Sequence, residues 1–389
     1  MVLLSVLVLS ESVLYRFRFK EQGRYSKQVT KTDALLQVTS TAKLHVPSRA
    51  FPVYPHSFPC IQEESTDKDT GIIFIKIHKS ASSTISNLVK RWSKNKAIHP
   101  NMKQCKAHFQ HAFAWSLPKL DKRIREKSFL FTFIREPTER FVSDFNYHGI
   151  SKQKQYNEAN LANFQNFTIN MKKNEFYPGY GGYTFQYMTT QKEKVPPIAN
   201  SKKYWNPSKP NIVQQPHALI SHVDDLLQEY DFIGIASRMD ESLVALTFLL
   251  KIPLDSVIYV RSRKTSGGYD FNAVKNECFF MQKTEATQDL KQYLASDQWK
   301  VSIAGDILLY KAVNLSLDKT IELIGREKFE TRMNKYLELK NMVDDICGEA
   351  QCSRCSATGE VIDLTRMEKD KRCKVEWCIQ AARIKLKQK

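Results

Sequence analysis

The chain has 389 residues, and 42% of them are hydrophobic, which is enough for one sizeable core with appendages. Lysine and arginine outnumber aspartate and glutamate by 59 to 41, so the formal net charge is +18. This balance favours a polyanionic partner such as an anionic membrane or a highly charged small molecule, although solvated lysine faces account for most of the cations. No zinc-finger spacing or arginine–aromatic repeat indicates nucleic acid, so a nucleic-acid partner is not expected.

The N-terminal segment, residues 1–15, is a short apolar run that Ser10 and Glu11 interrupt. A membrane span needs about 20 apolar residues. We therefore expect a truncated signal anchor, with a weak signal peptide or a buried strand or helix as the alternatives. Residues 16–70 are polar, contain several prolines and are predicted to be a stem or linker.

Three strand–loop–helix units follow. Residues 71–77, "GIIFIKI", read as a buried strand, and the apolar spacing over 85–92 predicts a helix. Residues 129–134 form the second strand and 137–148 its helix, and residues 230–251 form the third unit. Alternating strands and helices predict an α/β fold, a three-layer sandwich with a central parallel sheet.

A helical stripe from Phe329 to about Cys347 closes the predicted domain, residues 71–347. Residues 348–389 form a basic, Cys-rich tail, expected to be a helical appendage. The tail cysteines suit either a zinc site, because one pair has C-x-x-C spacing, or disulfides in an oxidising compartment. The sequons Asn166-Phe-Thr and Asn314-Leu-Ser favour the disulfides slightly.

The loop at residues 78–84, "HKSASST", follows the first predicted strand. Ligands of open α/β sheets bind at the carboxyl ends of the strands, where the amides of the next helix favour an anion. Small residues let the backbone approach a phosphate, and Lys79 adds positive charge. The Walker A pattern is absent and no aspartate obviously serves magnesium. The loop is therefore either a metal-free phosphate site or a serine-capped helix start.

A second anion site is predicted where the strand at residues 129–134 ends. Arg135 follows this strand directly, and Ser143 lies in the first turns of the next helix. An arginine fork grips phosphate in a bidentate manner, and a serine near a helix start adds a hydrogen bond. The alternative is a surface ion pair of Arg135 with Glu136 or Glu139. Together the two strand ends predict a ligand with two separated phosphates.

These two loops resemble the paired signatures with which sulfotransferases hold 3′-phosphoadenosine 5′-phosphosulfate. "FIKIHKSASST" is most similar to the galactose 3-O-sulfotransferase family, which includes galactosylceramide sulfotransferase and has roughly F-L-K-T-H-K-T-A-S-S-T here. "DESLVALTFLL", "DILLYKAVNLSL" and "MVDDIC" resemble further stretches of that family, so the similarity covers about residues 71–347. Ile77, Ser80 and Glu136 depart from the usual family residues, and the tail has no counterpart. These departures leave the acceptor sugar open.

The resemblance implies a P-loop-like sulfotransferase fold with that donor as co-substrate and no metal required. Sulfuryl transfer, like phosphoryl transfer, depends on positioning and charge stabilisation. By resemblance Lys79 is catalytic, because it binds the donor and supplies positive charge to the bond that breaks. Arg135 and Ser143 would hold the 3′-phosphate. The residues expected to hold the 5′-phosphate are Ser80, Ala81, Ser82, Ser83 and Thr84.

A catalytic base is expected in "CKAHFQHAFAW". His108 resembles a histidine of the family stretch C-N-H-M-R-F-H, and a neutral imidazole suits removal of a hydroxyl proton. His111 is the alternative because the spacing after Cys105 differs from the family, whereas His78 is expected to be structural.

Two further loops have a functional and a structural interpretation. The aromatic segment at residues 177–188 would stack on a sugar or adenine, or is an ordinary packed loop. In the basic segment at residues 259–268, Arg263 or Lys264 would contact the donor's 3′-phosphate, or the loop is simply solvated.

The expected function is sulfuryl transfer to the 3-OH of galactose in a glycolipid or glycan. The resemblance implies a single-pass type II Golgi membrane protein with a lumenal catalytic domain. A uronic-acid or other glycan O-sulfotransferase is the nearest alternative, since the positive charge suits an acidic acceptor. The missing Walker glycine–lysine pair argues against a nucleotide kinase. The presence of Lys79 and of a candidate base argues against an inactive polyanion- or nucleotide-binding protein.

Overall fold

The structure is a computed structural model. It describes residues 46–55, 71–94, 107–117, 120, 123–173, 183–190, 216–259, 267–272, 275–348, 354–363 and 374–388.

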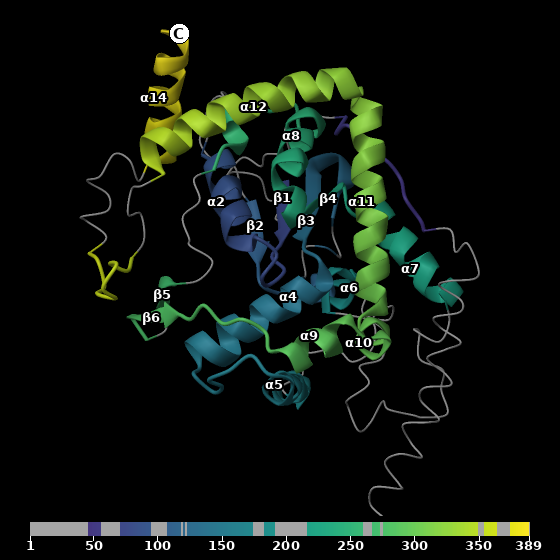
Figure 1. Ribbon diagram of the computed structural model, residues 1–389. Coiled ribbons are helices and arrows are strands. Elements are labelled where there is room, and N and C mark those ends of the chain that lie inside the picture. The colour runs from purple at the N-terminus through teal and green to yellow at the C-terminus, as the bar shows by residue number, and fades with distance from the viewer. Residues whose placement is uncertain are drawn as a thin grey trace, which may run out of the picture.

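A four-stranded, fully parallel sheet with the order β2-β1-β3-β4 lies at the centre of the molecule (Figure 1). β1 (Gly71–Ile75), β3 (Ser128–Ile134) and β4 (Phe232–Ile235) are buried along their whole length, whereas β2 (Ala107–Gln110) is half-exposed at the edge. Continuous apolar runs of this kind are typical of parallel strands that are covered on both faces. A separate antiparallel hairpin pairs β5 (Gly268–Asn272) with β6 (Glu277–Met281).

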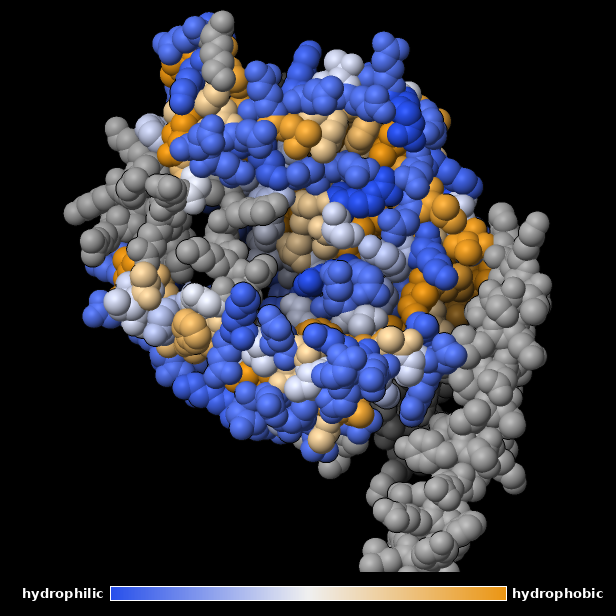
Figure 2. Space-filling view, viewed as in Figure 1, coloured by the Kyte–Doolittle hydropathy of each residue, from blue (hydrophilic) through white to orange (hydrophobic). Residues whose placement is uncertain are grey.

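Helices flank the sheet (Figure 1). α2 packs on β1 and β2, α8 packs on β4 and against α12, and α11 packs on β4 and against α4, α6 and α7. Figure 2 shows hydrophilic residues over most of the face on which α12 lies, consistent with the charged composition. The α-helices are α2 (Ser82–Trp92), α4 (Pro137–Asp144), α5 (Leu161–Lys173), α6 (Tyr183–Met188), α7 (Pro216–Glu229), α8 (Met239–Leu249), α9 (Gln288–Ala295), α10 (Asp297–Ser302), α11 (Ala304–Ile324), α12 (Arg326–Cys347) and α14 (Val375–Lys387).

Shorter helical turns connect these elements. They are the 3₁₀ turns η1 (Ala114–Ser116), η2 (Arg125–Lys127), η6 (Ala236–Arg238) and η7 (Leu254–Val257), and the π-helix η3 (Phe145–Lys152), which continues α4. A π-helix of this kind frequently marks a functional site.

The predicted α/β fold is confirmed, with all three strand–loop–helix units in place. The predicted helical stripe is α12, which ends at Cys347. β2 was not predicted, because its four residues carry neither an apolar run nor a clean alternation.

The tail is fastened to the domain by two disulfides, Cys347–Cys378 and Cys278–Cys355. α14 packs along α12, and Arg383 on α14 forms an ion pair with Asp255. No cluster of three or more histidine, cysteine or acidic side chains suited to a metal ion occurs in the part of the chain described. The tail cysteines that the structure describes, Cys347, Cys355 and Cys378, therefore form disulfides, as the second of the two sequence interpretations expects.

Residues 46–55, within the predicted stem, pack on the domain. Phe51 is fully buried, and its backbone N–H donates to Thr320 Oγ1 at 2.8 Å. Within the described ranges, no helix has the length and apolar character to cross a membrane. The predicted signal anchor at residues 1–15 lies outside those ranges.

Candidate active site

The loop between β1 and α2 has a backbone shaped for an anion. Lys79 and Ala81 have positive φ values of 61° and 59°, whereas Ser80 between them does not. Alternation of this kind turns successive backbone N–H groups toward one side and forms a concave nest. Ala81 is also the N-cap of α2 and makes no side-chain cap hydrogen bond. The helix amides therefore face the same concavity.

The side chains of this loop divide into buried and accessible groups. Ser80 is fully buried, and its Oγ has no hydrogen-bond partner among the described residues. Ser82 is also buried, Ser83 is exposed, and Lys79, Ala81 and Thr84 are partly exposed. Because an unpartnered buried hydroxyl costs about 1–3 kcal/mol, the loop fits an oxygen-rich ligand that would accept this hydrogen bond.

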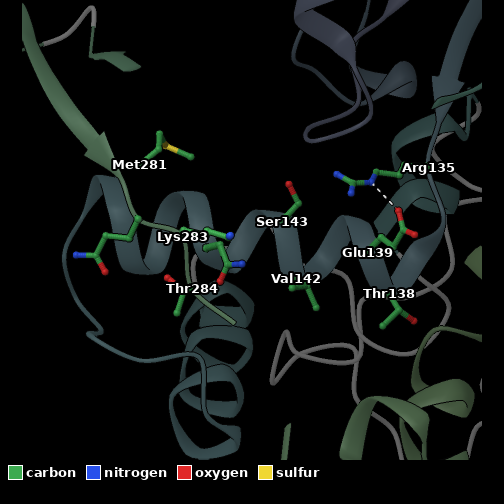
Figure 3. A pocket seen from close by; sticks show the side chains of 10 residues that line it. Arg135, Thr138, Glu139, Val142, Ser143, Met281, Lys283 and Thr284 are labelled. Carbon is green, nitrogen blue, oxygen red and sulfur yellow. Dashed lines mark hydrogen bonds and ion pairs between the residues drawn. The ribbon is translucent and has the colours of Figure 1, made fainter. Parts of the chain in front are cut away.

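Arg135 and Ser143 lie in one pocket of about 350 Å³ beside α4 (Figure 3). Ser143 lies between Arg135, which follows β3, and Lys283, which follows β6 (Figure 3). Two buried atoms of this pocket, Asn146 Oδ1 and Thr284 Oγ1, have no hydrogen-bond partner within the described residues. The lining residues are Arg135, Thr138, Glu139, Val142, Ser143, Asn146, Met281, Gln282, Lys283 and Thr284.

Arg135 forms the predicted surface ion pair inside this pocket. Its Nε donates to Glu139 Oε2 at 3.2 Å. Both side chains are accessible, with exposed fractions of 33% and 57%, so the pair contributes little and an anionic ligand can displace the carboxylate. The ion pair is therefore compatible with the phosphate site predicted from the sequence. Lys283 was not predicted, because nothing in "MQKTE" marks it as part of a motif.

A group of histidines lies where β1 and β2 end. The rings of His78 and His111 stack with their centroids 4.0 Å apart, and His148 on η3 meets His78 edge-on at 6.3 Å. His111 Nδ1–H donates to the carbonyl oxygen of Lys76 at 2.8 Å. This bond fixes the neutral tautomer and leaves Nε2 as a proton acceptor.

His108 and His111 occupy different places on β2. His108 pairs with Ile73, inside the sheet, whereas His111 follows Gln110, which pairs with Ile75 at the strand end. The structure thus brings His111, rather than His108, to the edge of the sheet where the Lys79 loop begins.

All three clustered histidines are held in the neutral form. Burial lowers the pKa of His78 to about 3. The repulsion that a charged ring would meet from His111 and His148, and the positive charges of Arg140 and Lys76, add to this effect. Burial also lowers the pKa of His111, with Lys76 contributing, and that of His148, where Asp144 opposes the shift. A neutral imidazole is the form that a proton acceptor requires.

A buried charged layer supports this group. Arg140 is fully buried, lies 4.2 Å from the ring centre of Tyr183 and faces Asp144. Asp306 on α11 accepts from the backbone N–H groups of Thr184 and Phe185, at 3.2 and 2.8 Å. These contacts fix α6, whose Tyr183 and Tyr187 face His78.

The described part of the aromatic segment 177–188 is therefore a packed helix, since all of α6 is buried. Residues 177–182, Arg263, Lys264 and Cys105 lie outside the described ranges.

Comparison with protein-family models matches residues 63–295 to the sulfotransferase family. The match covers more than half of the chain, and the parallel sheet with flanking helices agrees with it. The chain belongs to the sulfotransferase family and is an enzyme that transfers sulfuryl groups, for which 3′-phosphoadenosine 5′-phosphosulfate is the normal donor. A search of curated proteins finds no match.

The neutral state of His78 predicts a stability that depends on pH. Below pH 6.5 the unfolded chain protonates this ring, whereas the folded chain resists protonation down to about pH 3. The free energy of unfolding should therefore fall as the pH falls through this window. We expect His78→Gln to reduce the slope by up to about 1.4 kcal/mol per pH unit, measured by urea unfolding at several pH values. Parallel pH curves for the two proteins would contradict this assignment.

Proposed function

We propose that the chain transfers the sulfuryl group of 3′-phosphoadenosine 5′-phosphosulfate to a hydroxyl of a glycan or glycolipid. The observation that carries this proposal is the placement of two anion-binding features after two neighbouring strands. β1 and β3 pair in parallel, so the Lys79 loop and Arg135 leave the sheet at the same edge. Neighbouring strands lie about 4.8 Å apart, which suits one ligand with two anionic groups.

Each anionic group of the donor has its own set of residues. The nest of Lys79 to Ala81 and the start of α2 bind the 5′-phosphosulfate, and buried Ser80 donates to one of its oxygens. Arg135, Ser143 and Lys283 bind the 3′-phosphate in the pocket of Figure 3.

The reaction exchanges one S–O bond for another. The acceptor hydroxyl oxygen forms a bond to sulfur as the bond from sulfur to the bridging phosphate oxygen breaks, and adenosine 3′,5′-bisphosphate leaves. Lys79 stabilises the negative charge that develops on the bridging oxygen. His111 Nε2 takes the hydroxyl proton, because its Nδ1–H is engaged by Lys76 and its pKa keeps it neutral.

The acceptor is proposed from the resemblance of "FIKIHKSASST" to galactose 3-O-sulfotransferases, which favours the 3-OH of galactose. The net charge of +18 favours an acidic glycan instead and keeps a uronic-acid acceptor as the second candidate. We also propose a lumenal Golgi location with an N-terminal membrane anchor. The two disulfides support an oxidising compartment of this kind.

Donor binding is tested on immobilised adenosine 3′,5′-bisphosphate. The wild-type chain should be retained, and Arg135→Ala should lose retention because the bidentate contact to the 3′-phosphate is removed. Arg326→Ala is the matched control. Arg326, the first residue of α12, is also an exposed arginine that forms ion pairs with glutamates four residues away, Glu322 and Glu330. A chain that ignores this ligand but binds ATP would contradict the donor assignment.

The base is tested by comparing His111→Ala with His108→Ala. Loss of general-base catalysis should lower kcat about 100-fold or more in His111→Ala, with retention on the bisphosphate resin unchanged. His108→Ala should keep most of its turnover. Both are measured by transfer of radiolabelled sulfate to a panel of galactosides and uronic-acid oligosaccharides. The opposite ranking of the two variants would assign the base to His108.

A further inference from the structure

The ammonium group of Lys79 lies over an aromatic ring. Its Nζ is 3.9 Å from the ring centre of Tyr147, whereas Lys152 Nζ is 6.0 Å from the same ring. A cation at this distance over a tyrosine face is attracted by about 0.5–2 kcal/mol. Tyr147 thus holds the charged end of the loop that follows β1.

Tyr147 reaches this position through the π-helix η3. The ring meets Phe279 on β6 edge-on, with the centroids 5.7 Å apart, so the hairpin supports it from the side. The adjacent residue of η3, His148, faces His78. Gly149 allows η3 to pack closely, because a Cβ there would lie only 3.0–3.1 Å from Phe145, Phe167 and Tyr156. The π-helix therefore directs two consecutive side chains into the site.

We propose that Tyr147 is a positioning residue that holds the ammonium of Lys79 in place for the departing phosphate oxygen. This inference rests on the proposed function, in which Lys79 stabilises that oxygen. A free lysine side chain loses about 2 kcal/mol of rotamer entropy when it is fixed. The ring offsets part of this cost before the donor binds, and unlike a carboxylate it does not neutralise the charge.

The test compares Tyr147→Leu with Tyr147→Phe in the full chain. Leucine keeps an apolar contact with Phe279 but removes the ring face, so kcat should fall about 3- to 30-fold, corresponding to the strength of the cation–π contact. Phenylalanine keeps the ring and should restore kcat to within about 2-fold of the wild type. Retention on adenosine 3′,5′-bisphosphate should be the same for all three proteins. Equal kcat values in the two variants would overturn the proposal.

A second readout does not depend on turnover. The ring covers the amine of Lys79, so its removal should speed modification of Lys79 by an amine reagent at mildly alkaline pH, followed by peptide mass spectrometry. We expect faster labelling in Tyr147→Leu and unchanged labelling in Tyr147→Phe. Unchanged labelling in Tyr147→Leu would overturn the positioning role even if the chain proved to transfer no sulfate.

An independent observation concerns the two glycosylation sequons, which the fold places in different surroundings. Asn166 lies exposed on α5, whose Phe164 and Phe167 pack inward. In contrast, Asn314 Nδ2 donates to the carbonyl of Tyr310 at 2.9 Å. The third residue of that sequon, Ser316, is fully buried and accepts a hydrogen bond from the Arg49 backbone.

We infer that Asn166 carries an N-linked oligosaccharide and that Asn314 does not. The disulfides indicate the oxidising compartments in which this modification occurs. The oligosaccharide is supplied by a lipid-linked oligosaccharide pyrophosphate. A bond forms between the sugar C1 and Asn166 Nδ2, the glycosyl–phosphate bond breaks, and the lipid pyrophosphate and one amide proton leave. A glycan on Asn314 would break the contact with Tyr310, whereas Asn166 is exposed to solvent.

The test is the electrophoretic shift of the full chain from secretory eukaryotic cells on treatment with an amidase that removes N-linked glycans. The wild type should shift by one glycan. Asn166→Gln and Thr168→Ala should abolish the shift, whereas Thr168→Ser and Asn314→Gln should keep it. Absence of a shift in the wild type, or its loss in Asn314→Gln, would overturn the inference.

Discussion

The parallel pairing of β1 with β3 is the constraint on which the rest of the site depends. Both strands are wholly buried, so their register is set by the core and cannot slip without exposing apolar side chains. Their carboxyl ends fix where the Lys79 loop and Arg135 leave the sheet. The separation of the two proposed anion sites is thus determined by backbone hydrogen bonds, and the individual side chains need only local adjustment.

Strain is concentrated in the same loop. Lys79 and Ala81 adopt left-handed backbone conformations that cost a non-glycine residue about 1 kcal/mol or more each. Glycine would reduce this cost but would enlarge the entropy lost on folding and would remove the Lys79 side chain. The loop therefore forms two left-handed turns of the backbone without glycine, and it keeps the Lys79 side chain, whose ammonium lies over Tyr147.

The sequence was sufficient for the features that arise from local patterns. The apolar runs at residues 71–77 and 129–134 predict the central strands that the structure shows as β1 and β3, and the small residues after the first of them predict the anion loop. Lys283 and Tyr147 could not be predicted in the same way. Lys283 approaches Arg135 only because β6 packs against η3, and Tyr147 reaches Lys79 only because the helix after α4 has π geometry. The choice between His108 and His111 likewise depends on the register of β2, a strand too short and too polar to predict.

The electrostatics of the histidine group connect donor binding with base strength. The pKa values of His78 and His111 are lowered by burial and further by Lys76, so without a ligand these rings are neutral but weakly basic. The proposed donor brings several negative charges to the adjacent loop, and nearby negative charge raises the pKa of a histidine. Donor binding would therefore offset the effect of Lys76 and raise the proton affinity of His111. In the proposed function, the cations of the site keep His111 neutral before the donor binds. The proton affinity of His111 then rises when the donor, and with it the sulfuryl group, is in place.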